Sequence, residues 1–242
     1  MTAPTTPVLQ PLKPIAGRDV LIALGAAALI FAVSLSFLGL LLEKDPSGPR
    51  RQLITIVAFA ANAAAFGGAA WILLMRRPGY RWADLGVLPV DPVWLKRAIY
   101  IGVALVPVAF LLAAGIRALT GVEAPKGIGI APKGMSWLAA GTIVLYAGIL
   151  VPIFEEIFFR GVFFGWLRQK MSLPAAILVS AGVFAVFHLR IDVIVPAFLT
   201  GVILAWMYGR SGSVLPGILL HQVFNTTQLV LVYGLIALAP GS

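Results

Sequence analysis

Two adjacent glutamates and an arginine lie inside one of the most apolar stretches of the chain. Glu155, Glu156 and Arg160 occur in Val-Pro-Ile-Phe-Glu-Glu-Ile-Phe-Phe-Arg, residues 151–160. A charge at the centre of a bilayer costs at least about 2.5–3.5 kcal/mol, so such groups mark candidate functional sites. On one helix Glu156 and Arg160 share a face and can pair. Glu155 points away from that face, as expected of a carboxylate free to exchange protons. The same residues could instead form an ion-pair cluster that ends a helix at the membrane interface.

The only two histidines of the chain lie in later apolar runs. His188 closes Phe-Ala-Val-Phe-His, while His221 and Asn225 are four residues apart and share a helical face. Taken singly, His188 could be structural, and His221 with Asn225 could be an interhelical hydrogen-bond pair. If the two histidines, Asn225 and the glutamates converge in a water-containing cavity, all of them can form hydrogen bonds there. Carboxylate and imidazole groups together are typical of general acid–base hydrolysis.

The composition indicates a membrane protein. Hydrophobic residues make up 60% of the 242 and charged residues 11%, against about 25% charged residues in soluble proteins. The net charge of +9 comes from basic residues scattered among short loops, which favours a multi-pass membrane protein and excludes a nucleic-acid partner. The absence of cysteine excludes thiolate chemistry, and the absence of a G-x-x-x-x-G-K-[ST] loop argues against a nucleotide.

The apolar runs predict an all-α polytopic transmembrane helix bundle of seven spans, because each run is near the about 20 residues that a bilayer needs. We expect the long run that contains the glutamates to bend after Arg160, with residues 161–170 near the interface. An eighth span would arise if part of 161–170 entered the membrane or if the last run broke. Asn62, in the second run, is expected to mark helix packing. The runs are 20–42, 53–75, 98–116, 137–159, 173–189, 192–208 and 214–238.

The chain divides into three predicted regions. Residues 1–17 are expected to be a disordered tail, 18–75 to form two N-terminal transmembrane helices, and 76–242 to form the core with the polar groups. The first run is too long for a signal-peptide core. Of the 18 Lys and Arg residues, ten fall on the N-terminal side of the predicted spans, seven on the other side, and Arg160 belongs to the polar cluster. The excess predicts a cytoplasmic N-terminus, and the composition is compatible with a bacterial inner membrane.

The three polar patterns, in this order, resemble the CPBP family, which includes CAAX prenyl proteases and bacteriocin-immunity-like (Abi) proteins. The family shows E-E-x-x-x-R, F-x-x-x-H and H-x-x-x-N, which correspond here to residues 155–160, 184–188 and 221–225. Asp84-Leu-Gly86 also looks like a family feature. The resemblance covers roughly residues 76–228.

The resemblance implies an intramembrane endopeptidase that acts on a membrane peptide or a lipidated protein. Glu155 would take a proton from the attacking water and pass it to the leaving amine, with Glu156 and Arg160 in support. The remaining catalytic residues would be His188, His221 and Asn225.

Other chemistries and functions fit the same residues. We expect no required cofactor, but Glu155, His188 and His221 could bind Zn²⁺ as a two-histidine, one-carboxylate set with an open position for water. A non-catalytic immunity or partner-binding protein could use the same scaffold. A proton-coupled transporter would also explain buried glutamate and histidine.

Overall fold

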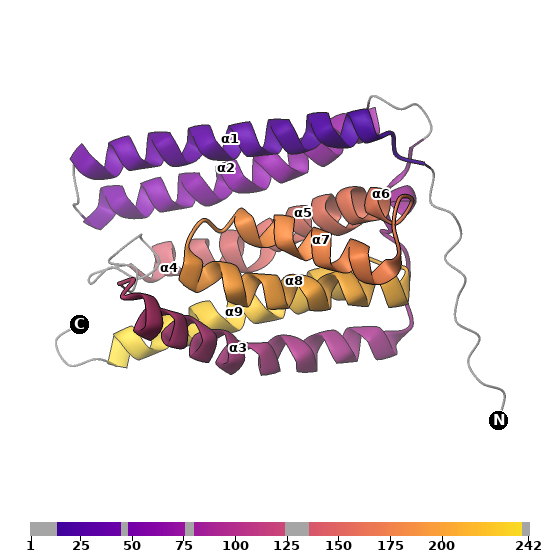
Figure 1. Cartoon of the computed structure of the whole chain (residues 1–242). Coiled ribbons are helices and arrows are strands. Elements are labelled where there is room, and N and C mark those ends of the chain that lie inside the picture. The colour runs from indigo at the N-terminus through magenta and orange to yellow at the C-terminus, as the bar shows by residue number, and fades with distance from the viewer. Residues whose placement is uncertain (1–13, 45–47, 76–79, 124–135, 239–242) are drawn as a thin grey trace.

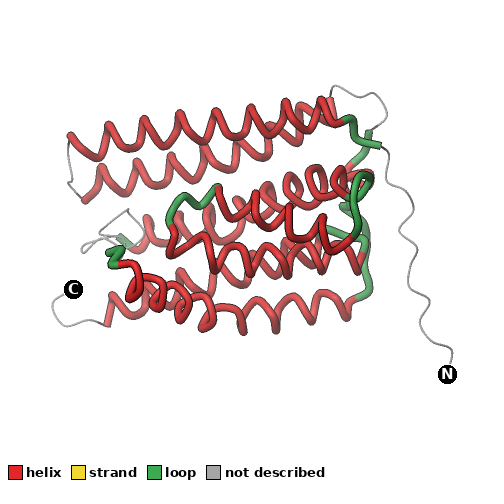
Figure 2. The backbone as a smooth tube through the Cα atoms, in the orientation of Figure 1, coloured by secondary structure: helices red, strands yellow, loops and turns green. Residues whose placement is uncertain are grey.

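The computed structural model describes residues 14–44, 48–75, 80–123 and 136–238. These residues form helices joined by loops and contain no strand (Figure 2). The predicted all-α transmembrane bundle is confirmed, because six helical segments are long and apolar enough to cross a membrane. They are α1 (Gly17–Lys44), α2 (Gly48–Met75), α3 (Pro92–Thr120), the α4–α6 segment (Trp137–Leu167), α8 (Ile191–Ser211) and α9 (Leu215–Leu238).

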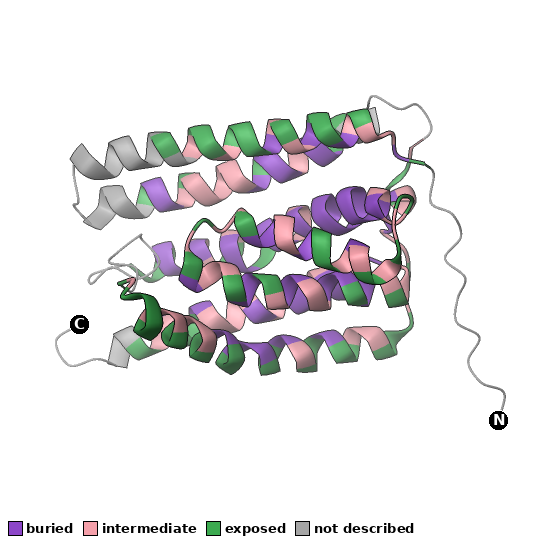
Figure 3. Cartoon of the chain, viewed as in Figure 1, coloured by how far each residue is buried: buried purple, intermediate pink, exposed green. Residues whose placement is uncertain are grey.

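The run predicted at 173–189 forms a shorter apolar helix, α7 (Leu173–Val186). Consecutive helices run in opposite directions, as short connections require (Figure 1). The α1–α2 hairpin forms one layer along α4–α6 in Figure 1, while α7 packs on α8, and α3 packs on both α8 and α9. Buried residues concentrate along α5 and α6, and exposed residues follow the outer faces of α1 and α3 (Figure 3).

The α4–α6 segment is one continuous helix with two π-helical stretches. It does not bend after Arg160 as we had expected, but continues to Leu167 with residues 157–165 buried. The residues after Arg160 are apolar and find protein partners, so they have no reason to lie at the interface. No eighth span forms among the described residues, because residues 161–167 extend the same helix and α9 is unbroken from Leu215 to Leu238. The parts are α4 (Trp137–Ile143), η2 (Val144–Leu150), α5 (Val151–Glu156), η3 (Ile157–Phe164) and α6 (Gly165–Leu167).

A short connecting segment locks the middle of this helix in place. The 3-10 helix η1 (Trp82–Leu85) ends at Gly86, whose φ of 80° suits glycine. The side chain of Leu85, the last residue of η1, is fully buried. A Cβ atom on Gly161 would lie 2.5 Å from the backbone oxygen of Leu85. Gly161 therefore allows the segment to lie directly on the helix that carries the glutamates.

The α1–α2 hairpin shares its core with the rest of the bundle. Ala23, Ala27 and Ala69 pack against Phe158 and Phe159, a pairing of small and large residues that allows close helix contact in a membrane. Residues 1–13 of the predicted tail lie outside the described residues. The side chain of Ile15, which is described, is buried in the core.

Candidate functional site

The predicted Glu156–Arg160 pair is present and fully buried. Arg160 donates through Nη1 to Glu156 Oε1 at 2.8 Å, and both side chains are 0% exposed. Arg160 Nη2 donates to the backbone oxygen of Gly201 at 3.3 Å, and its guanidinium lies 4.4 Å from the ring centre of Phe184. One arginine thus joins the glutamate helix to α7 and α8.

Glu156 also orients His221. The Nδ1 atom of His221 lies 2.9 Å from Glu156 Oε1, the oxygen that accepts from Arg160. Since an ionised carboxylate can only accept, Nδ1 of His221 carries the hydrogen. The opposite ring atom, Nε2, lies 3.9 Å from Glu155 Oε2. This distance is too long for a direct hydrogen bond and is one that a water molecule can bridge.

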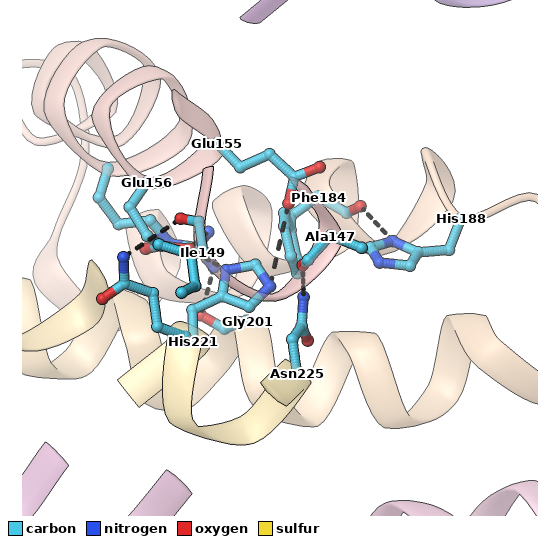
Figure 4. A network of polar contacts seen from close by, with 11 residues as sticks. Ala147, Ile149, Glu155, Glu156, Phe184, His188, Gly201, His221 and Asn225 are labelled. Carbon is cyan, nitrogen blue, oxygen red and sulfur yellow. Dashed lines mark hydrogen bonds and ion pairs between the residues drawn. The ribbon is translucent and has the colours of Figure 1, made fainter. Parts of the chain in front are cut away.

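Glu155 lies next to the Glu156–His221 pair but is not part of it. Its side chain is nearly buried, and it reaches the cavity side of α5, whereas Glu156 points into the protein (Figure 4). The 100° rotation between neighbouring residues of a helix separates the two roles. One carboxylate is held by Arg160 and His221, and the other faces open space.

His188 follows the last turn of α7. Its Nδ1 lies 3.2 Å from the backbone oxygen of Phe184. A carbonyl can only accept, so Nδ1 carries the hydrogen, and the neutral ring offers Nε2 as an acceptor. The next residue, Leu189, has a φ of 60°, an uncommon conformation for a residue other than glycine. This sharp turn ends α7 and starts the return towards α8.

Asn225 contacts the π-helical stretch that precedes the glutamates. Its Nδ2 donates to the backbone oxygen of Ala147 at 3.0 Å (Figure 4). In η2 the N–H of Val151 bonds five residues back, to Tyr146, so the next donor in the series would come from residue 152. That residue is Pro152, which has no N–H. Asn225 therefore supplies the donor that the backbone lacks.

Two neighbours of Asn225 also donate to carbonyls of η2 and were not among the predicted site residues. Gln222 Nε2 donates to Ile149 O at 3.1 Å, and Thr226 Oγ1 donates to Gly148 O at 3.4 Å. The signal that could have revealed them is a proline inside one apolar run and a cluster of polar side chains inside another. Backbone groups freed inside a membrane helix must find side-chain or water partners.

The four predicted catalytic residues line one cavity of about 260 Å³, which lies between the α1–α2 hairpin, the η2–α5–η3 part of the long helix, α7 and α9. Asn62, which we predicted as a packing residue, lines it too. Glu156 and Arg160 lie behind its wall. The lining residues are Phe31, Phe59, Asn62, Phe66, Ala147, Val151, Glu155, Phe159, Phe184, Phe187, His188, His221 and Asn225.

The residues as placed do not fit a zinc ion. Across the described ranges no three histidine, aspartate or glutamate side chains are grouped so that they could hold a metal. The alternative set of Glu155, His188 and His221 is therefore not preformed.

Comparison with known proteins identifies a family that the chain resembles. Residues 136–227 match the model of the family described as Type II CAAX prenyl endopeptidase Rce1-like. This part of the chain is therefore similar to the Rce1-like family. The resemblance inferred from the three motifs is thereby confirmed, and the Rce1-like region contains every predicted site residue.

Two curated bacterial proteins are similar to the chain. "Putative membrane peptidase YdiL" of Bacillus subtilis is 28% identical over 93 residues, which is 38% of this chain and 38% of YdiL. "UPF0177 protein YxdF" of Lactococcus lactis is 29% identical over 79 residues, 32% of this chain and 43% of YxdF. The matched stretches thus span less than half of either relative. No solved structure matches the chain significantly.

Proposed function

We propose that this protein is an intramembrane endopeptidase in which Glu155 activates a water molecule. The observation that carries the proposal is the convergence of Glu155, His188, His221 and Asn225, from three separate helical regions, on one cavity among apolar helices. The similarity of residues 136–227 to a prenyl endopeptidase family supports the same reaction class. Groups that a bilayer penalises are gathered where they can contact a substrate and a water molecule.

The first half of the reaction uses Glu155 as a general base. A water molecule lies between Glu155 and Nε2 of His221, and Glu155 removes one of its protons. The water oxygen bonds to the carbonyl carbon of the scissile peptide, and the carbonyl oxygen becomes an oxyanion. The second hydrogen of the water is donated to one acceptor, Nε2 of His221 or Nε2 of His188, and this orients the water oxygen. Glu156 and Arg160 keep the ring of His221 in place.

The second half returns the proton. The carbon–nitrogen bond breaks as protonated Glu155 gives its proton to the leaving nitrogen, so the products are a carboxylic acid and an amine and Glu155 is again ionised. Asn225 uses one Nδ2 hydrogen on Ala147 O, which leaves a second amide hydrogen for the oxyanion. Asn225 therefore both positions the helix and stabilises the intermediate.

The substrate is a membrane-embedded peptide or a lipidated protein, because the catalytic groups lie within apolar helices. The protein acts as a multi-pass enzyme of a bacterial inner membrane with a cytoplasmic N-terminus, and it needs no metal or nucleotide.

The test is cleavage by the purified protein of a library of lipidated and unlipidated membrane peptides. Glu155→Gln keeps the shape of the side chain but cannot act as a base, so the rate should fall by about 10²–10⁴-fold. Glu123→Gln is the matched control, because Glu123 is exposed after the end of α3 and outside the cavity. It should cleave at the wild-type rate.

Other outcomes of the cleavage assay would favour a different mechanism or a different function. Equal rates for wild type and Glu155→Gln would refute the proposed base. Loss of activity with a zinc chelator, restored by added Zn²⁺, would favour the zinc alternative. A wild-type protein that cleaves no member of the library would favour the non-catalytic immunity or partner-binding function.

A further inference from the structure

The wall of the cavity opposite the catalytic groups comes from a different part of the chain. Phe31 of α1 and Phe59, Asn62 and Phe66 of α2 line it, and all four lie outside the Rce1-like residues 136–227. The reaction chemistry and the opposite wall are therefore supplied by separate segments. A wall that takes no part in the chemistry is free to select the substrate.

Asn62 is the one polar side chain that α1 and α2 contribute to the described lining. Its Oδ1 is buried and has no hydrogen-bond partner. An unpaired amide oxygen is costly in apolar surroundings. In a pure packing role it would accept a hydrogen bond from a neighbouring helix. Its position instead suits a donor that a ligand brings into the cavity.

The rest of this wall is aromatic and large enough for a side chain. Phe31 and Phe59 are partly exposed to the space, while Phe66 is buried against Phe158 and Phe159 and holds the wall in place. A dry cavity of about 150 Å³ can accept benzene, and a water molecule occupies about 30 Å³. The cavity of about 260 Å³ thus has room for one large apolar side chain beside the attacking water.

We propose that the α1–α2 hairpin is the substrate-selecting wall of the site. Phe31 and Phe59 hold a large apolar side chain next to the scissile bond, and Asn62 Oδ1 accepts a backbone N–H of the same peptide. This inference rests on the proposed function, because the substrate has a scissile bond only if the protein is a peptidase. Recognition itself does not require cleavage and can be measured apart from it.

The experiment measures binding of two small probes to the Glu155→Gln protein in lipid nanodiscs, with empty nanodiscs as background. The probes are N-acetyl-phenylalanine methylamide and N-acetyl-alanine methylamide. Burial of the larger side chain should make the phenylalanine probe bind about tenfold more tightly or better. Phe59→Ala should remove most of this preference. Asn62→Ala should weaken both probes about two- to tenfold and leave their ratio unchanged.

Val57→Ala is the matched control, because Val57 lies on the same helix and is 51% exposed away from the cavity. It should bind both probes as the parent protein does. Equal binding of the two probes by the parent, or no binding at all, would overturn the inference. So would a preference that Phe59→Ala leaves intact or that Val57→Ala also removes.

The cleavage assay separates this inference from the proposed function. If the preference between the probes depends on Phe59 and the affinity for both probes depends on Asn62, but Glu155→Gln still cleaves, the catalytic proposal fails and the selecting wall stands. If cleavage depends on Glu155 but neither substitution in α2 changes probe binding, only the selecting wall fails.

Discussion

At the scale of the residue, Glu156 is the centre of the buried polar network. Its Oε1 accepts from both Arg160 and His221. A Cβ atom on Gly217 would lie 3.2 Å from its Oε2, so α9 approaches the carboxylate closely. The i,i+4 pairing of Glu156 and Arg160 could be predicted because it is local to one helix. The contact with His221 could not, since it joins residues 65 positions apart.

The buried pair makes a stability prediction. Arg160→Met leaves Glu156 as an uncompensated buried charge, and breaking such a pair costs about 3–5 kcal/mol. The double variant Glu156→Gln/Arg160→Met should recover part of this loss, because no buried charge remains on either residue. Thermal unfolding in detergent measures both. Arg210→Met, at an exposed arginine, should change stability by less than about 0.5 kcal/mol. If Arg160→Met were as stable as Arg210→Met, the buried pair would not stabilise the protein as predicted.

At the scale of the element, the π-helical stretch η2 and α9 form one unit. Pro152 leaves Ala147 O without its backbone donor, and side chains of α9 bond to three consecutive carbonyls, those of residues 147–149. Sequence alone indicated only that both segments are helical. It could not show the π-helical register, because the same apolar residues fit either kind of helix. These bonds hold η2 in place, and Glu155 follows about two turns later on the same helix.

Thr226→Val tests this unit because valine keeps the shape and removes the donor to Gly148 O. Hydrogen bonds between membrane helices are worth about 0.6 kcal/mol on average and at most about 1.7 kcal/mol, so the loss of stability should fall in this range. If the bond positions Glu155, kcat should fall while KM stays nearly constant. Thr227→Val, on the next residue and rotated about 100° around the helix, is the control. A Thr226→Val protein with the wild-type kcat would restrict the bond to a structural role.

At the scale of the whole molecule, the loops alternate between two ends of the bundle. In Figure 1 the start of α1 and the α6–α7 turn lie at one end, and the last residues of α3 lie at the other. The distribution of basic residues predicts that the first end is cytoplasmic.

Because the chain contains no cysteine, single cysteines report this orientation directly. Gln169→Cys, in the α6–α7 turn, should react with a membrane-impermeant maleimide only after the cells are permeabilised. Thr120→Cys, at the end of α3, should react in intact spheroplasts. Both native side chains are exposed, so burial does not prevent labelling. The reverse pattern would show a periplasmic N-terminus.

The sequence by itself determined the class of the protein and the identity of its candidate site. Apolar runs of bilayer length allow only helices, and the free-energy cost of charge in a membrane makes Glu155, His188 and His221 conspicuous. The tertiary structure decided where each group lies and what it contacts. Glu155 lines the cavity and Glu156 lies behind its wall. Asn225 donates one hydrogen to Ala147 O, and Asn62 of α2 lines the same cavity. These relations join residues distant in the chain, and they depend on helix packing that no local spacing encodes.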